Sequence, residues 1–125
     1  MGTEPRLLVA DDDADIRDLV TFKLRQAGYD VVAVADGSAA LAEARANPPA
    51  LAVLDVMMPG LSGLDVLRDL KADEATQDVK VILLTARSRD LDVDAGYAGG
   101  ADDYVIKPFS PRELVHRVGT LLARS

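Results

Sequence analysis

The chain has 125 residues, 49% of them hydrophobic and 28% charged, with a formal net charge of −7, which is typical of one globular domain over residues 1–125. Without cysteine it has no disulfide and no thiolate ligand, and its acidic balance argues against direct nucleic-acid binding. No apolar run suits a membrane span or a signal core, so we expect a cytoplasmic protein with a flexible segment at residues 1–5.

The first half of the chain contains three predicted strands, at residues 6–10, 29–34 and 51–54. Asp13 is the expected N-cap of a helix after the first strand, whose inward residues follow a helical spacing: Ile16, Leu19, Val20, Leu24 and Ala27. An alanine-rich helix opens at 36–38 and stops at the prolines of 47–49. The run at 51–54 is wholly apolar, which indicates a strand buried on both faces of a parallel sheet.

The second half contains two more predicted strands, at 79–84 and 103–106. A capping box at 62–65 starts the helix between the third and fourth strands. Ser110, followed by proline and glutamate, starts the last helix. The expected inward residues of these two helices are Leu64, Leu67 and Leu70 in the first and Leu114, Val115, Val118, Leu121 and Leu122 in the second. A further helix at about 89–98 has the poorest pattern, because it is acidic and contains a glycine.

Strands and helices alternate five times, which predicts right-handed crossovers and a parallel sheet with helices on both faces. The expected fold is therefore an α/β three-layer sandwich of the flavodoxin-like (βα)5 type with strand order 2-1-3-4-5. This order makes the first and third strands neighbours, about 4.8 Å apart. Ligands of such sheets bind at the carboxyl ends of the strands, where the strand order reverses.

Three carboxylates, those of Asp11, Asp12 and Asp55, are expected to converge at that point. They repel one another unless they share a cation, and oxygen ligands without histidine or cysteine favour Mg²⁺. Thr85 and Lys107 end the fourth and fifth strands on the same rim, where a hydroxyl and an ammonium can contact phosphoryl oxygens. The pattern predicts a metal-assisted site in which Asp55 is the nucleophile that accepts a phosphoryl group.

Four motifs match one protein family in order, over essentially the whole chain. They are VADDD at 9–13, LDVMMPGLSG at 54–63, LTA at 84–86 and GADDYVIKPF at 100–109. On these motifs the chain resembles the receiver domain of bacterial two-component response regulators. It looks most like the subfamily that is linked to winged-helix DNA-binding domains, with Ala10 as a mild departure from the family's usual valine.

The resemblance implies that Asp55 takes a phosphoryl group from a histidine kinase or a small phosphodonor. It implies that Mg²⁺ is held by Asp12, Asp55 and the main-chain carbonyl of Met57, while Asp11 acts through a water. The domain would catalyse only its own phosphorylation and dephosphorylation, and would not be an enzyme that turns over substrates.

The resemblance also implies a set of switch residues. Lys107 is expected to contact the phosphoryl group, Thr85 to move toward it and Tyr104 to swing inward, and the bond before Pro108 is expected to be cis. The face made by the helix at 89–98, the strand at 103–106 and the last helix would then control an output domain or partner protein.

In the winged-helix-linked subfamily that the chain resembles, that face forms a homodimer. The charged positions of this interface are matched here by Asp102, Asp103, Glu113 and Arg117. The helix at 89–98 departs from the subfamily, because Val93 stands where arginine is usual and Gly99 adds a breaker. Whether the chain is a stand-alone receiver or part of a longer regulator stays open, as do the kinase and the output partner.

Two other functions compete with the switch. A haloacid-dehalogenase-like phosphohydrolase also uses a strand-end aspartate with Mg²⁺, but it usually carries a second acid where this chain has Met57. A partner-binding domain without phosphate chemistry is disfavoured by the complete set of acids, hydroxyl and lysine. Taken singly, the residues have simpler interpretations. Residues 11–13 are read as helix caps and a solvated turn, Asp55 and Thr85 as strand-end residues, and Tyr104 as a strand aromatic. Met57 and Met58 are read as packing residues, and residues 102–103 as a solvated acidic turn unless a dimer forms.

Overall fold

Five parallel strands form one sheet in the order β2-β1-β3-β4-β5, in a computed structural model that describes residues 5–86 and 99–124. The strands are β1 (Arg6–Ala10), β2 (Asp30–Val34), β3 (Leu51–Asp55), β4 (Lys80–Ala86) and β5 (Asp103–Lys107). This is the predicted strand order. The helix expected at 89–98, with its departure at Val93, and the segment 1–4 lie outside the described residues.

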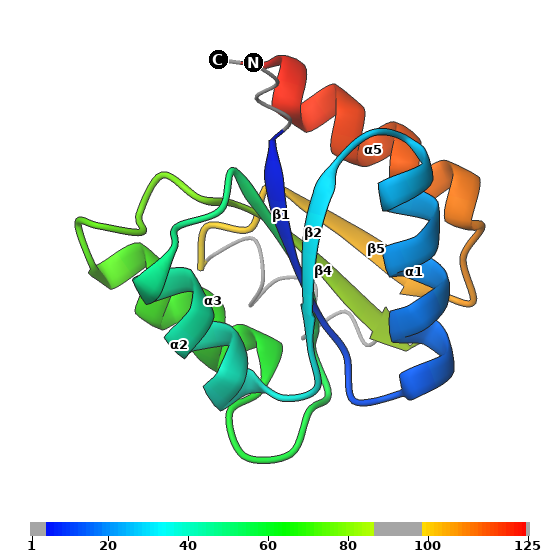
Figure 1. Cartoon of the computed structure of the whole chain (residues 1–125). Coiled ribbons are helices and arrows are strands. Elements are labelled where there is room, and N and C mark those ends of the chain that lie inside the picture. Colours follow the sequence, from blue (N-terminus) through cyan, green and yellow to red (C-terminus); the bar gives the residue numbers. More distant parts are fainter. Residues whose placement is uncertain (1–4, 87–98, 125) are drawn as a thin grey trace.

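Four helices cover the sheet in the part of the chain that is described. They are α1 (Ala14–Gln26), α2 (Gly37–Ala46), α3 (Gly63–Ala72) and α5 (Pro111–Ala123). Figure 1 shows α2 and α3 on one face of the sheet and α1 and α5 on the other. The three-layer α/β architecture expected from the alternation of strands and helices is therefore confirmed. Among the described helices, none is both long and apolar enough to cross a membrane.

The predicted helix starts are present, and each is stabilised by a side chain that accepts backbone N–H groups. The Asp13 carboxylate accepts the N–H groups of Asp15 (2.9 Å) and Ile16 (3.2 Å). At α3 the Ser62 hydroxyl accepts the Asp65 N–H (3.1 Å), and the Asp65 carboxylate accepts the Ser62 N–H (3.0 Å), which is a complete capping box. These caps fix where α1 and α3 begin, directly after the loops that carry the acidic residues.

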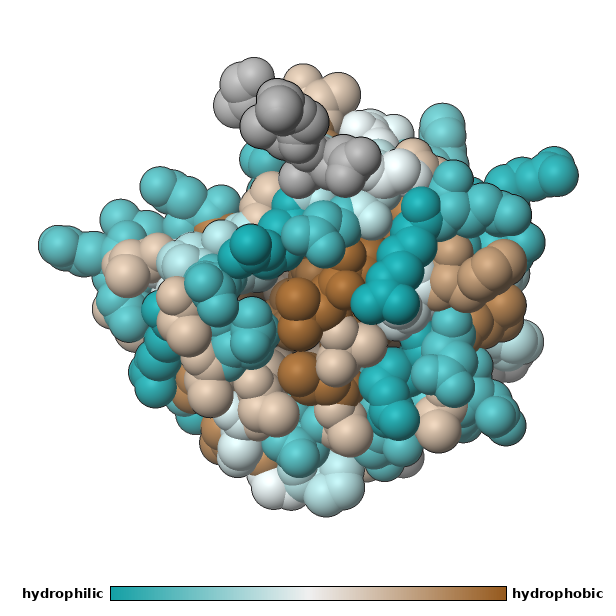
Figure 2. All heavy atoms as spheres, viewed as in Figure 1, coloured by the Kyte–Doolittle hydropathy of each residue, from teal (hydrophilic) through white to brown (hydrophobic). Residues whose placement is uncertain are grey.

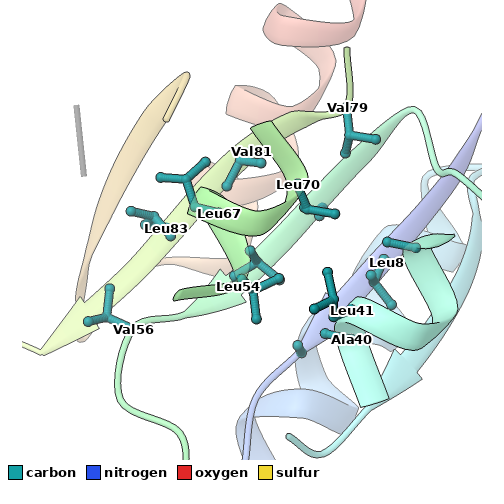
Figure 3. Packing of buried hydrophobic residues seen from close by; sticks show 14 of the residues in the cluster. Leu8, Ala40, Leu41, Leu54, Val56, Leu67, Leu70, Val79, Val81 and Leu83 are labelled. Atoms are coloured by element: carbon teal, nitrogen blue, oxygen red, sulfur yellow. The ribbon is translucent and has the colours of Figure 1, made fainter. Parts of the chain in front are cut away.

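The core consists of two apolar layers separated by the sheet. One layer lies under α2 and α3, where Leu54, Leu67 and Leu83 pack closely (Figure 3). The other lies under α1 and α5 and includes Val53 of β3 and Val105 of β5. Every residue of β3 is buried, as expected for a central strand with helices on both faces. The ends of this strand are therefore held rigidly.

The inward face of α1 differs from the expected one. Leu19 is 44% exposed and Ala27 is also exposed, whereas Thr21 takes a buried position beside Val20. The reason is geometric: α1 packs on the sheet through the narrow stripe of Val20, Thr21 and Leu24, and Leu19 points to one side of it. Figure 2 shows another apolar area at the surface, at the centre of the face where Figure 1 places the edge strand β2.

Candidate functional site

The three acidic residues meet at the carboxyl ends of β1 and β3. Ala10 and Leu54 are register partners, so Asp11 and Asp55 follow side by side. One carboxylate oxygen from each of Asp11, Asp12 and Asp55 lies within 4.8 Å of the others. Asp11 and Asp55 are buried, and Asp12 is exposed at the mouth of the cluster. The convergence predicted from the strand order is thus present.

Lys107 supplies the positive charge of the cluster. Its Nζ atom lies 3.2 Å from Asp11 Oδ2 and 3.4 Å from Asp55 Oδ2, and its side chain is only 18% exposed. The other Asp11 oxygen, Oδ1, accepts the Asp13 N–H at 2.9 Å. The lysine comes from β5, an edge strand two places from β3, and its long side chain crosses β4 to reach the acids.

The cluster carries more negative than positive charge, and it is largely buried. Burial and the nearby Asp11 carboxylate raise the pKa of Asp55 from 3.8 to about 7, and Lys107 opposes this only in part. Three ionised carboxylates and one ammonium leave two negative charges, which is the charge that one divalent cation compensates. The donors are all hard oxygens, so the residues present fit Mg²⁺.

Thr85 lies near the cluster, and its hydroxyl bonds elsewhere. Leu84 is the register partner of Asp55, so Thr85 lies one residue further along β4. Its hydroxyl is buried and donates to the main-chain oxygen of Ala86 at 3.1 Å. Tyr104 of β5 is buried in the apolar layer on the α2–α3 side, where it pairs in register with Leu83. The Lys107–Pro108 peptide bond is cis, the geometry implied by the resemblance.

The two methionines after β3 differ in their exposure to solvent. Both were expected to pack in the interior, but the Met57 side chain is 70% exposed while Met58 is buried. The chain turns away from the sheet at this point, and Gly60 adopts a φ of +75° in the same turn. The Met57 N–H points back and donates to Asp55 Oδ1 at 3.4 Å. Only the main chain of Met57 is therefore directed at the site.

Asp102 is exposed, as expected of a solvated turn residue, and it also has a structural role. Its carboxylate accepts the Val81 N–H at 2.8 Å, and its own N–H donates to the Val81 carbonyl at 2.8 Å. This pair extends the β4–β5 pairing just before β5 begins. Other charges expected at a dimer interface are paired within the chain: Arg117 contacts Asp103 at 2.8 Å and Glu113 at 2.9 Å.

Two contacts at the site escaped the sequence analysis. The Arg17 side chain donates from Nη1 to the main-chain oxygen of Asp11 at 2.8 Å. Gly63 packs so closely that a Cβ atom at this position would collide with the main-chain oxygen of Asp55. The helical pattern gave no signal for either contact, because both partners are main-chain oxygens. The LSG sequence at 61–63, where α3 begins, was the only clue to the second.

Comparisons with known proteins agree with this geometry. The family model described as "Response regulator receiver domain" matches residues 7–119. The DNA-binding response regulator MtrA of Mycobacterium tuberculosis (strain H37Rv) is 45% identical over 120 residues, which are 96% of this chain and 51% of MtrA. The phosphate regulon transcriptional regulatory protein PhoB of Escherichia coli (strain K12) is 42% identical over 119 residues, which are 95% of this chain and 52% of PhoB.

Solved structures give the same result. A putative response regulator from Chloroflexus aurantiacus superposes with a TM-score of 0.92 at 36% identity, covering 98% of this chain and all of that one. DrrB, a Thermotoga maritima OmpR/PhoB homolog, gives a TM-score of 0.86 at 38% identity, covering 98% of this chain and 54% of that one. The chain spans about half the length of the curated relatives named above.

Proposed function

The chain belongs to the response regulator receiver domain family, and on this premise we propose that its phosphorylation site is Asp55. Receiver domains are phosphorylatable switches of two-component systems and not classical enzymes. The observation that carries the assignment is the position of Asp55: a buried carboxylate at the end of β3, 3.4 Å from Lys107 and within the acidic cluster.

In the proposed reaction an Asp55 carboxylate oxygen attacks the phosphorus atom of the donor. The bond between phosphorus and the donor nitrogen or oxygen breaks, and the donor leaves with that electron pair, so Asp55 becomes an acyl phosphate. The proposed donors are the phosphohistidine of a histidine kinase and small phosphodonors. Lys107 already contacts Asp55, so its ammonium is placed to neutralise charge on the transferred group.

We assign the Mg²⁺ site to Asp12, Asp55 and the main-chain carbonyl of Met57, with Asp11 acting through a water. When bound, the ion neutralises the acids and orients phosphoryl oxygens. The fully buried Asp11 carboxylate is already engaged by Lys107 and by the Asp13 N–H, which suits an indirect role. The exposed Asp12 carboxylate remains for direct coordination.

The proposed switch uses Thr85 and Tyr104. A phosphoryl group on Asp55 adds about one negative charge and new acceptor oxygens. The Thr85 hydroxyl, now bonded to the Ala86 carbonyl, exchanges this acceptor for a phosphoryl oxygen. The Tyr104 side chain then swings inward. The two residues are coupled because β4, which carries Thr85, pairs directly with β5, which carries Tyr104. The change thereby reaches β5 and α5, which we propose as part of the output face.

We also propose partners and a location for the whole regulator. The relatives named above are DNA-binding or transcriptional regulators about twice as long as this chain. We infer that this receiver controls an output domain or partner of that type, in the cytoplasm. The internal Arg117 contacts with Asp103 and Glu113 would have to rearrange if the same charges joined a homodimer.

The test is intact-protein mass spectrometry after incubation with acetyl phosphate, with and without Mg²⁺. We expect a gain of one phosphoryl group that requires Mg²⁺ and disappears in Asp55→Asn. Asp78→Asn is the matched control, because Asp78 is an exposed acid just before β4, at the opposite end of the sheet. Phosphate release without a stable phosphoform would instead support the phosphohydrolase. No gain and no release would support a domain without phosphate chemistry.

A further inference from the structure

We propose that Arg17 is a positioning residue that holds the acidic turn at 11–13 and thereby sets the Mg²⁺ affinity of the site. The proposal rests on the proposed function, because it takes Asp12 and Asp55 as the acids that hold Mg²⁺. Arg17 lies in the second turn of α1 and is half-buried, although its neighbours Asp15 and Asp18 are exposed. Its side chain is thus directed back toward the turn that precedes the helix.

Arg17 is bonded to both ends of the acidic turn. Its guanidinium donates from Nη1 to the Asp11 carbonyl at 2.8 Å. Its main-chain N–H donates to the Asp13 carbonyl at 2.9 Å. The residue between these two anchors is Asp12. The main-chain bond belongs to the regular hydrogen-bond pattern of α1 and would form with any residue except proline. The guanidinium bond to the Asp11 carbonyl is therefore the anchor that depends on arginine.

The position of the Asp12 carboxylate depends on the main chain of the turn more than that of Asp11 does. The Asp11 carboxylate is held by the Asp13 N–H and by Lys107, and the Asp11 N–H donates to the Val34 carbonyl at 3.3 Å. Within residues 5–86 and 99–124 no hydrogen bond or ion pair holds the exposed Asp12 carboxylate. Its placement toward the cluster is therefore set by the main chain of the turn.

Arg17 also carries a charge, and this charge acts in the opposite direction. A guanidinium close to the acids repels a divalent cation, so its removal by electrostatics alone would strengthen Mg²⁺ binding. Loss of the hydrogen bond to the Asp11 carbonyl would instead loosen the turn and weaken binding. The two effects differ in sign, which makes the Mg²⁺ affinity a decisive measurement.

The positioning role predicts weaker binding. Loss of groups that orient metal ligands typically reduces metal affinity by about 10- to 100-fold. We expect Arg17→Gln to raise the dissociation constant for Mg²⁺ by at least about tenfold on the same grounds. Arg17→Lys keeps the charge and one donor, so its affinity should fall between those of Arg17→Gln and the wild type. At saturating Mg²⁺ both variants should reach the wild-type level of phosphorylation.

The chain offers a matched control on the same helix. Arg25 also donates from its guanidinium to a main-chain carbonyl, that of Val31, at 2.9 Å. Arg25→Gln therefore removes the same kind of bond and the same charge, but at the end of α1 far from the acidic turn. It should lower thermal stability as Arg17→Gln does and leave the Mg²⁺ affinity unchanged.

The experiment is a calorimetric titration of Mg²⁺ into the four proteins without phosphodonor, together with their melting temperatures. A tenfold or greater loss of affinity in Arg17→Gln alone, with partial recovery in Arg17→Lys, supports the proposal. Unchanged or tighter binding in Arg17→Gln overturns it, and so does an equal loss in Arg25→Gln. Absence of Mg²⁺ binding by the wild type would refute the metal site itself, which is a separate and recognisable failure.

Discussion

Asp55→Asn should stabilise the metal-free domain at neutral and alkaline pH. The pKa of Asp55 is raised from 3.8 to about 7 in the folded protein, chiefly by burial and secondly by the Asp11 carboxylate. The folded state therefore keeps a proton that the unfolded chain has already released. Because the folded state binds more protons in this interval, the free energy of unfolding of the wild type falls as the pH rises from about 4 to about 7.

The size of the effect follows from the same two pKa values. Each pKa unit corresponds to about 1.4 kcal/mol, so the interval between 3.8 and about 7 corresponds to roughly 4 kcal/mol. Asparagine has the same shape as aspartate and no charge, so the folded state of the variant is not destabilised by a buried charge at this position. Lys107 keeps its contact with Asp11 in the variant. We expect the free energy of unfolding of the variant to exceed that of the wild type by up to about 4 kcal/mol at pH 8. Near pH 4 the two free energies should be nearly equal.

The assay is urea unfolding followed by circular dichroism at pH 4, 5, 6, 7 and 8, with a chelator present. Asp78→Asn is again the control, since this exposed acid should give nearly the same stability as the wild type at every pH. A difference between Asp55→Asn and the wild type that does not change with pH would refute the reasoning. So would a wild type that gains stability between pH 5 and pH 7 relative to the variant. Added Mg²⁺ should stabilise the wild type at pH 8 more than the variant.

Three further substitutions test the packing around the site. Gly63→Ala should cost about 1–3 kcal/mol in urea unfolding and slow phosphorylation, because the added methyl group displaces the main chain at Asp55. Thr21→Val should raise the melting temperature, since the Thr21 hydroxyl is buried with no hydrogen-bond partner among the described residues. Ser62→Ala should cost about 1 kcal/mol by breaking the capping box with Asp65, and an unchanged urea midpoint would contradict the role of this cap.

The fold could be predicted because its signals are local and periodic. The apolar run of β3 and the alternation of strands and helices determined the class, and chirality rules then left few strand orders. The starts of α1 and α3 followed from Asp13 and Ser62, whose side chains cap the backbone within three residues. Leu19 was placed wrongly, because helical spacing does not reveal how narrow the contact stripe of α1 is.

The site was partly predictable for a different reason. Strand order alone brings Asp11 and Asp55 together, so a correct topology gives the acids directly. Arg17 was missed because its partner is a main-chain carbonyl, and any sequence offers such an acceptor. The exposure of Met57 was missed because the direction of a turn is not encoded in hydropathy. Contacts between side chains at strand ends are thus readable from sequence. Contacts with the main chain are readable only where a local capping pattern marks them, as at Asp13 and Ser62.

Lys107 balances part of the negative charge at the site. This ammonium stands between Asp11 and Asp55, at 3.2 and 3.4 Å, and is the only cation that contacts either carboxylate among the described residues. The pKa of Asp55 stays raised because burial and the neighbouring Asp11 carboxylate outweigh the effect of this single ammonium. A bound cation that brings compensating positive charge relieves the repulsion. The wholly buried β3 provides the rigidity that keeps Asp55 in this unfavourable place.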